Sequence, residues 1–283
     1  MSQFDYGKVK NPEFFRENRL EAHSDHVSNR SHEEQREGKT SLRMSLNGLW
    51  KFSYAPNYES VIKDFEKPEC DCRGWADIRV PAHIQMEGYD APQYANVQYP
   101  WDGREEALPG QIPQRFNPVA SYVKYFEVPE EWKGEPVYIS FQGVESALAL
   151  WCNGSYVGYS EDSFTPSEFD LTPYLKEGEN KLAAQVFKWC SSSWCEDQDF
   201  FRFSVIFRDV YLYTIPVVHI RDMKVQTLLN DSLDQATLVL ELAATAEGQV
   251  QVKLLEEGRV YRFDKAFRRN EGQISDTMTA AEL

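Results

Sequence analysis

The chain of 283 residues has little basic charge and no long apolar run. Its 30 Lys and Arg residues stand against 45 Asp and Glu residues, which gives a formal net charge of −15. Nucleic-acid binding requires clustered basic side chains, so this balance argues against a nucleic-acid partner. No stretch approaches the roughly 18 to 20 uninterrupted apolar residues of a membrane span, and Met1–Lys10 does not resemble a signal peptide. The sequence therefore predicts neither a nucleic-acid partner nor a membrane partner.

Cysteine is also scarce, with an odd total of five. Cys70 and Cys72 are separated by one residue and Cys190 and Cys195 by four, and neither spacing is that of a zinc knuckle. We therefore expect reduced cysteines in a cytoplasmic protein.

Helical periodicity is scarce too, and short strand-like runs with alternating apolar and polar residues take its place. The first part of the chain contains six of them, at 49–54, 121–127, 136–141, 147–152, 181–189 and 205–213. Asn153-Gly154 stands between two apolar runs and predicts a hairpin turn. Glu59–Phe65 is the best candidate for a short helix. Many short strands with turn signals indicate an all-β sandwich.

Composition divides the chain into three parts. Residues 1–45 are charged and lack apolar periodicity, which predicts an extended N-terminal arm. Residues 46–215 carry every tryptophan and form the predicted sandwich domain. Residues 216–283 contain further runs at 223–228, 236–243, 249–255 and 260–263, with no closing strand expected from Ile274 onward. An immunoglobulin-like sandwich needs about seven strands, so this second β domain is expected to be incomplete.

Two clusters of aromatic and polar residues, at 88–101 and 189–202, are candidates for sugar binding. A pyranose packs its C–H face on an aromatic ring and pairs its hydroxyls with carboxylates and amides. The alternative is that both are ordered loops with satisfied polar groups. The adjacent carboxylates of Glu161-Asp162 and Glu196-Asp197 point to opposite faces of a strand, so neither pair makes a convincing acid and nucleophile. The residues by themselves give no complete active site.

Several longer motifs resemble glycoside hydrolase family 2, in particular the lac-type bacterial β-galactosidases. These motifs are LWCNGSYVGY at 150–159, PSEFDL at 166–171, GENKL at 178–182, EDQD at 196–199 and IFRDV at 206–210. NRLEAH at 18–23, SLNGLW at 45–50, GYDAP at 88–92 and YANV at 94–97 follow the order of the family. The resemblance is dense over about residues 10–215.

This resemblance implies a jelly-roll, galactose-binding-like β-sandwich, then an immunoglobulin-like domain, and in the complete enzyme a TIM barrel with both catalytic glutamates. The chain would be the non-catalytic N-terminal region of a retaining β-galactosidase that hydrolyses terminal β-D-galactosides such as lactose. It would contain no catalytic residue of its own. The positions that match the family's substrate-hydroxyl contacts are Asn96 and Asp199. By the same resemblance Asp199 would ligate a sodium ion whose other ligands come from the barrel.

The sequence departs from the family pattern at two places. Val205 replaces a glycine, which removes easy access to positive φ. The run Ser191–Ser193 lacks a carboxylate that some relatives have there, so magnesium is expected in the full enzyme and not in this chain. Arg208 and Asp209 are expected to form a structural ion pair. The resemblance further implies a homotetramer, with the N-terminal arm at a subunit interface.

Two other functions remain open on the sequence. The chain could be a free-standing carbohydrate-binding module, which would hold sugar with its own rings. It could also be a structural or assembly domain. The N-terminal part of an enzyme would instead bind sugar only together with the catalytic barrel.

Overall fold

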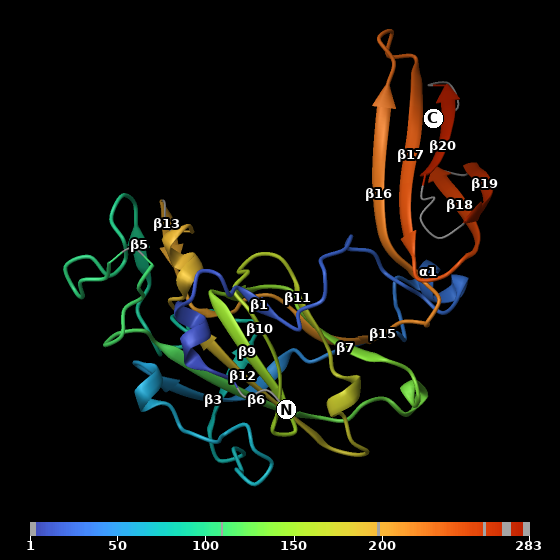
Figure 1. The fold of residues 1–283 in the computed structure, drawn as a ribbon. Coiled ribbons are helices and arrows are strands. Elements are labelled where there is room, and N and C mark those ends of the chain that lie inside the picture. Colours follow the sequence, from blue (N-terminus) through green and yellow to red (C-terminus); the bar gives the residue numbers. More distant parts are fainter. Residues whose placement is uncertain (1–3, 109, 197–198, 257–258, 268–272, 280–283) are drawn as a thin grey trace. The chain divides into compact units, whose positions relative to one another are not determined.

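The computed structural model describes residues 4–108, 110–196, 199–256, 259–267 and 273–279, and the fold is nearly all β (Figure 1). Every strand pairing in these segments is antiparallel. The contacts divide the chain into two compact units. Unit 1 comprises Met1–Glu21 and Ser41–Thr214, and unit 2 comprises Ala22–Thr40 and Ile215–Leu283. The predicted all-β sandwich class is confirmed.

Unit 1 contains a large sheet, a smaller sheet and two short ribbons. The large sheet has the order β1 (Arg16–Glu17), β10 (Ser155–Ser160), β9 (Ala147–Cys152), β12 (Asn180–Phe187), β6 (Val119–Phe126), β3 (Gly48–Ala55) and β4 (Ala76–Val80). The smaller sheet has the order β11 (Ser167–Asp170), β7 (Val137–Phe141), β15 (Val210–Thr214) and β2 (Arg43–Ser45). The ribbons pair β13 (Phe200–Arg202) with β5 (Gln93–Ala95), and β14 (Val205–Ile206) with β8 (Val144–Glu145).

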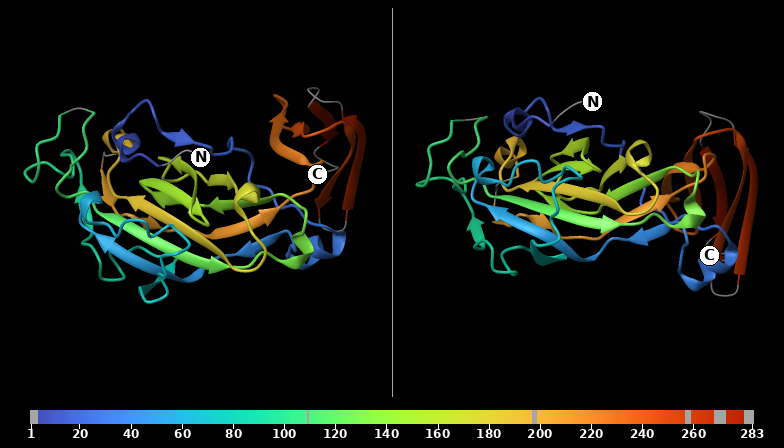
Figure 2. Two further views of the ribbon diagram at one scale, coloured as in Figure 1. Left: turned by 60° about the horizontal axis from the view of Figure 1, so that its bottom comes forward. Right: turned by 90° about the horizontal axis from the view of Figure 1, so that it is seen from below.

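Short 3₁₀ turns connect these strands. They are η1 (Tyr6–Lys10), η2 (Tyr58–Ser60), η3 (Glu130–Trp132), η4 (Thr172–Tyr174) and η5 (Ser191–Trp194). The helix expected at Glu59–Phe65 is thus only the short turn η2. Figure 2 shows the N-terminal segment, in dark blue, running across unit 1.

The central strands of the large sheet are buried on both faces, which explains the nearly continuous apolar character of β12. Every residue of β12 is buried. Leu182, Ala184 and Val186 belong to a core shared with the smaller sheet. Ala183 and Phe187 point to the opposite face, where the N-terminal segment and the loop after β3 cover them. Successive strand residues alternate between faces, so one strand serves two cores.

The hairpin predicted at Asn153-Gly154 is confirmed between β9 and β10. Both residues have a positive φ, 51° and 83°, as this type of tight turn requires. A Cβ on Gly154 would lie 2.7 Å from Cδ of Pro68, so packing also favours glycine.

The prediction of a single strand at 205–213 is wrong. It divides into β14 and β15 with a break at residues 207–209. Arg208 and Asp209 interrupt the alternation there, and Val210 begins the pairing of β15 with β7. The apolar pattern continues through Phe207, so the sequence gives no sign of the break between β14 and β15.

The described residues of unit 2 form a helix, α1 (His32–Glu37), and five strands. The strands are β16 (Ile220–Leu229), β17 (Gln235–Ala244), β18 (Gly248–Glu256), β19 (Arg259–Phe267) and β20 (Gln273–Thr279). The order β16-β17-β20 forms one sheet and β18-β19 a second. Leu240 and Leu242 of β17 form a small core with Val250 and Val252 of β18.

The expectation of no closing strand from Ile274 onward is wrong, because β20 pairs with β17 along seven residues. Backbone hydrogen bonds to β17 hold β20 in the sheet, whereas the weak apolar pattern of its sequence gives no sign of a strand.

The first 45 residues do not run as one extended arm. Residues up to Glu21 belong to unit 1, residues 22–40 to unit 2, and β2 to the smaller sheet of unit 1. Val9 in η1 is fully buried, and Phe4 packs against Trp151 with ring centroids 5.5 Å apart. These apolar residues are too sparse to produce a hydrophobic periodicity in the sequence.

Lys181 at the start of β12 fastens the loop that follows β3 to the large sheet. Its buried Nζ donates to the carbonyl oxygens of Phe65, Lys67 and Cys70 at 2.6, 2.8 and 2.6 Å. A buried ammonium needs such partners, and buried carbonyls need a donor. The side chain therefore satisfies both at once.

We predict that Lys181→Met destabilises unit 1 by on the order of 2–4 kcal/mol, because it leaves three carbonyls without their charged donor. Urea denaturation followed by tryptophan fluorescence measures this. Lys133→Met is the matched control, since exposed Lys133 only pairs with exposed Glu177 and should cost less than about 1 kcal/mol. Equal effects of the two substitutions would contradict the role of Lys181.

Candidate functional site

The two residues that the sequence singled out meet on the ribbon of β5 and β13. Asn96 follows β5 directly and Asp199 precedes β13 directly. The backbone N–H of Asp199 donates to the carbonyl oxygen of Asn96 at 3.1 Å. The ladder continues with Phe200 opposite Ala95 and Phe201 opposite Tyr94. The ribbon lies at the end of unit 1 opposite the strand ends near β15, on the left in Figure 1.

Both side chains of this pair are exposed. Asp199 has a φ of 56°, a left-handed conformation that Asp tolerates better than most residues. The hydroxyl of Tyr94 donates a hydrogen bond to Oδ1 of Asp199. The arrangement thus presents an amide, a carboxylate and a phenol next to one another, which are groups that pair with hydroxyls.

Buried ionic contacts hold the base of the ribbon. Arg202 of β13 is buried, and its Nη2 donates to the carbonyl oxygen of Glu196. Lys188, which directly follows β12, forms an ion pair with Asp90 in the loop before β5, and the two side chains are 1% and 7% exposed. Gln85 also donates to Oδ2 of Asp90 at 3.1 Å. The loop that leads into β5 is therefore fixed to the central strand of the large sheet.

Two carboxylates considered in the sequence as acid or nucleophile accept hydrogen bonds within unit 1. Glu196 is half-buried and accepts from the hydroxyl of Ser163 at 3.3 Å. Glu161 is buried and accepts from the hydroxyls of Tyr159 at 2.6 Å and Ser191 at 2.7 Å, and from the N–H of Ser192 at 3.1 Å. Burial raises the pKa of Glu161. Burial likewise raises the pKa of Glu196 to about 7. These contacts give both side chains a structural role. Asp197 lies outside the described residues.

Glu145 of β8 is a buried carboxyl that the sequence did not single out. Burial raises its pKa to about 8, although the charges of Arg202 and Lys188 and the N–H of Phe203 act in the opposite direction. Glu196 adds a further rise through like charge. Desolvation therefore exceeds the attraction of two neighbouring cations, and the carboxyl is largely protonated at neutral pH.

Of the rings in the cluster 88–101, only Tyr94 lies at Asp199. Tyr89 packs on Phe52 of the core with ring centroids 4.5 Å apart. Trp101 is buried, and Tyr99 stacks on it at 5.3 Å with an interplanar angle of 6°. The interpretation as ordered loops therefore holds for Tyr89, Tyr99 and Trp101. Tyr99 and Trp101 organise the segment between β5 and β6.

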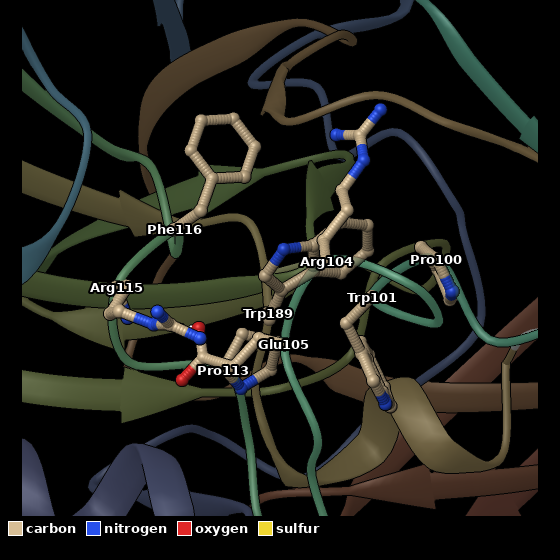
Figure 3. A pocket seen from close by; sticks show the side chains of 8 residues that line it. All are labelled: Pro100, Trp101, Arg104, Glu105, Pro113, Arg115, Phe116 and Trp189. Carbon is tan, nitrogen blue, oxygen red and sulfur yellow. Dashed lines mark hydrogen bonds between the residues drawn. The ribbon is translucent and has the colours of Figure 1, made fainter.

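This segment also encloses a small pocket of ≈ 60 Å³ (Figure 3). It is lined by Pro100, Trp101, Arg104, Glu105, Pro113, Arg115, Phe116 and Trp189. The carboxylate of Glu105 accepts the backbone N–H groups of Gln114 and Arg115 at 2.9 and 3.0 Å. A volume of this size holds a few water molecules. The pocket is too small to enclose a sugar ring, and Glu105 serves to close the loop.

The implied metal ions fit the chain to different degrees. Asp199 presents an exposed carboxylate, which is a suitable single ligand for a hard cation such as sodium. The hydroxyl of Ser191 donates to Glu161 at 2.7 Å, and magnesium in the full enzyme stays a prediction. Within the described residues, no cluster of three or more His, Cys, Asp or Glu side chains could hold a metal ion.

Two other expectations concern the segment that follows β13. The expected ion pair between Arg208 and Asp209 is wrong. Arg208 donates to the carbonyl oxygen of Phe164 at 2.8 Å, and Asp209 accepts from Asn47 at 2.9 Å. Adjacent residues point in different directions, so each finds its own partner. Val205 is buried in β14 and is not among the described residues with a positive φ, so the missing glycine is no obstacle there.

Sequence reasoning missed Glu145, Lys188 and Arg202, which support the ribbon. Each is a charged residue in or beside an apolar strand, and a charged residue there is buried only with a partner. That signal was present for Lys188, because it follows the apolar run of β12.

All five cysteines are free. Among the described segments, none of the helices has the length and apolar character needed to cross a lipid bilayer.

Comparison with known proteins gives consistent matches. The profile of "Glycosyl hydrolases family 2, sugar binding domain" matches residues 43–216. A β-galactosidase of Halalkalibacterium halodurans is 54% identical over 241 residues, which are 84% of this chain and 24% of that protein. A β-galactosidase of Clostridium acetobutylicum is 50% identical over 253 residues, which are 89% of this chain and 28% of that protein. The chain spans about a quarter of the length of these relatives.

Solved structures share the fold at lower identity. A β-glucuronidase of an uncultured Clostridium species has a TM-score of 0.61 at 23% identity, and the match covers 92% of this chain and 42% of that chain. A β-glycosidase from Bacteroides vulgatus has a TM-score of 0.60 at 22% identity, with 84% and 29% covered.

The raised pKa of Glu145 predicts that unit 1 loses stability as the pH rises. The folded state holds a proton between the ordinary value of 4.5 and about 8 that the unfolded state has released, so the free energy of unfolding falls over this interval. Glu145→Gln removes this titration, and should stabilise unit 1 by on the order of 2 kcal/mol near pH 8 with little change near pH 5. Urea denaturation at several pH values measures this, and an unchanged pH slope would contradict it.

Proposed function

The chain belongs to the glycosyl hydrolases of family 2, and from this premise we propose that it supplies substrate contacts to a β-galactosidase. In this proposal Asn96 and Asp199 bind hydroxyls of a terminal β-galactoside. The acid and the nucleophile lie in a barrel outside these 283 residues. Identities of 50–54% to curated β-galactosidases support the choice of substrate class.

The proposed reaction is hydrolysis with retention. Retaining glycosidases use two carboxyl groups about 5–5.5 Å apart, one as nucleophile and one as acid and base, with a covalent glycosyl-enzyme intermediate. Glu161 is unsuited to this task because three hydrogen-bond donors enclose it, and Glu196 is held in unit 1 by the hydroxyl of Ser163. The contribution of this chain is therefore binding and orientation of the sugar.

One observation carries the proposal. Asn96 and Asp199 are 103 positions apart in the sequence numbering, yet a backbone hydrogen bond of 3.1 Å joins them with both side chains exposed. An ionised carboxylate and an amide side chain in one place can hold neighbouring hydroxyls of one sugar, and charged acceptors make the stronger hydrogen bonds.

Exposed aromatic side chains around the ribbon support the proposal that an additional domain packs against it. Tyr94 and Phe201 are 52% and 54% exposed, and Phe164 and Phe200 are also exposed. Phe164 contacts Phe200 with ring centroids 5.7 Å apart, and Tyr94 contacts Phe201 at 5.3 Å, so the exposed rings form two pairs. Exposed apolar groups of this kind mark interaction surfaces. In the proposal the barrel covers them.

In the complete enzyme Asp199 would also hold a sodium ion together with ligands from the barrel. The ion would supply positive charge for a sugar hydroxyl, while Asp199 keeps the carboxylate oxygen in place. We further infer a homotetrameric enzyme in the cytoplasm, where free cysteines such as the five in this chain remain reduced.

In the full-length enzyme, we predict that Asp199→Ala and Asn96→Ala each lower kcat/KM for a chromogenic galactoside. The loss for Asp199→Ala should be on the order of 2–4 kcal/mol in transition-state binding, since a charged hydroxyl contact disappears. Asp170→Ala serves as the control, because Asp170 ends β11 and only accepts the N–H of Thr172 at 2.9 Å. A near wild-type value for Asp199→Ala would overturn the proposed role.

For residues 1–283 by themselves, we predict no turnover of a chromogenic galactoside and no binding at millimolar galactoside. The physical reason is that half of the proposed pocket is absent. Calorimetric titration tests the second point. Millimolar or tighter binding would favour a carbohydrate-binding module, and activity that persists across independent preparations would refute the first point.

A further inference from the structure

We propose that Tyr94 is a positioning residue, whose hydroxyl fixes the carboxylate of Asp199 for the substrate. The proposal rests on the proposed function, because it concerns the same site. It adds a residue that neither the family match nor the sequence reasoning assigned to a role.

The strand register explains why these two side chains meet. Tyr94 lies opposite Phe201 in the antiparallel ladder of β5 and β13. Asp199 is two positions before Phe201, so Tyr94 and Asp199 are diagonal neighbours across the ribbon. Such neighbours lie about 7–8 Å apart at Cα, a distance that a long aromatic side chain can bridge. The hydroxyl of Tyr94 indeed reaches Oδ1 of Asp199.

Asn96 follows β5 directly, and its carbonyl oxygen accepts the backbone N–H of Asp199 at 3.1 Å. The hydrogen bond from Tyr94 places the phenol against the carboxylate of Asp199, and Phe201 packs on the Tyr94 ring at 5.3 Å between centroids. The ring contact restrains the phenol, and the phenol restrains the carboxylate.

Restraint matters at this position because Asp199 is exposed and lies on a turn. A free aspartate there would rotate between several rotamers, and binding would have to overcome that entropy. A hydrogen bond from a phenol to a carboxylate is charge-assisted and therefore among the stronger ones. It engages Oδ1 and leaves Oδ2 for a substrate hydroxyl or a cation.

A different role for Tyr94 would be direct packing of its ring on the sugar. In that role, the substitutions of Tyr94 and Asp199 would lower kcat/KM independently of each other. In the positioning role their effects depend on each other, since removal of the phenol hydroxyl lowers kcat/KM only while the carboxylate is there. A double-mutant cycle separates the two.

The test uses the full-length enzyme with Tyr94→Phe, Asp199→Asn and the double variant. We expect Tyr94→Phe to lower kcat/KM about tenfold, and the double variant to be no worse than Asp199→Asn. Tyr99→Phe is the matched control and should be unchanged, because Tyr99 lies in the same segment and its ring stacks on Trp101. Additive losses in the double variant, or no loss for Tyr94→Phe, would overturn the proposal.

A second readout does not depend on activity. Fluorotyrosine placed at position 94 of the full-length enzyme reports the phenol by fluorine NMR. Its fluorine resonance should differ between the parent and the Asp199→Asn variant, because the phenol loses its charged acceptor. An identical resonance in both would overturn the contact.

The outcomes distinguish this proposal from the proposed function. If Asp199→Asn retains full kcat/KM, the substrate role of Asp199 fails and the positioning role fails with it. If Asp199→Asn loses kcat/KM while Tyr94→Phe does not, only the role of Tyr94 fails.

Discussion

Burial of the central strands of the large sheet on both faces is the constraint on which the rest of unit 1 depends. Strand β12 has no exposed residue, so its neighbours must supply apolar side chains to two cores. The segment that leads to β13 follows β12, and the loop that leads to β5 follows β4. Lys188 directly follows β12 and holds Asp90, and through it the loop before β5. The ribbon that carries Asn96 and Asp199 is thereby attached to the most deeply buried part of the fold.

Environment separates the carboxylates of unit 1 into two groups with different uses. Glu145 and Glu161 are buried and Glu196 is half-buried, and burial raises the pKa of each. The hydrogen bonds of Glu161 and Glu196 hold strands and turns together. Asp199 is exposed, and its one described side-chain partner is the phenol of Tyr94. A sugar needs an accessible charged acceptor, so of these four carboxylates Asp199 suits the proposed binding role.

The sequence predicted the strands best where alternation and turn chemistry agreed. β9 was predicted to the residue, and Asn153-Gly154 gave its hairpin. Prediction failed where the pattern misled: an apolar run hid the break at residues 207–209, and β20 has too few apolar residues to be seen. For the site, no local signal placed Asn96 beside Asp199. Their selection came from resemblance, and their roles in binding stay a prediction.

By itself the sequence determined the β class, the two regions of strands and the residue types available for sugar contacts, because periodicity and composition are local properties. Only the tertiary structure decided which carboxylates are enclosed and which one is exposed. Partners such as Ser191 for Glu161, or Tyr94 for Asp199, come from distant positions. Pairing between distant strands sets these neighbours, and it depends on register and on burial of both faces of a sheet.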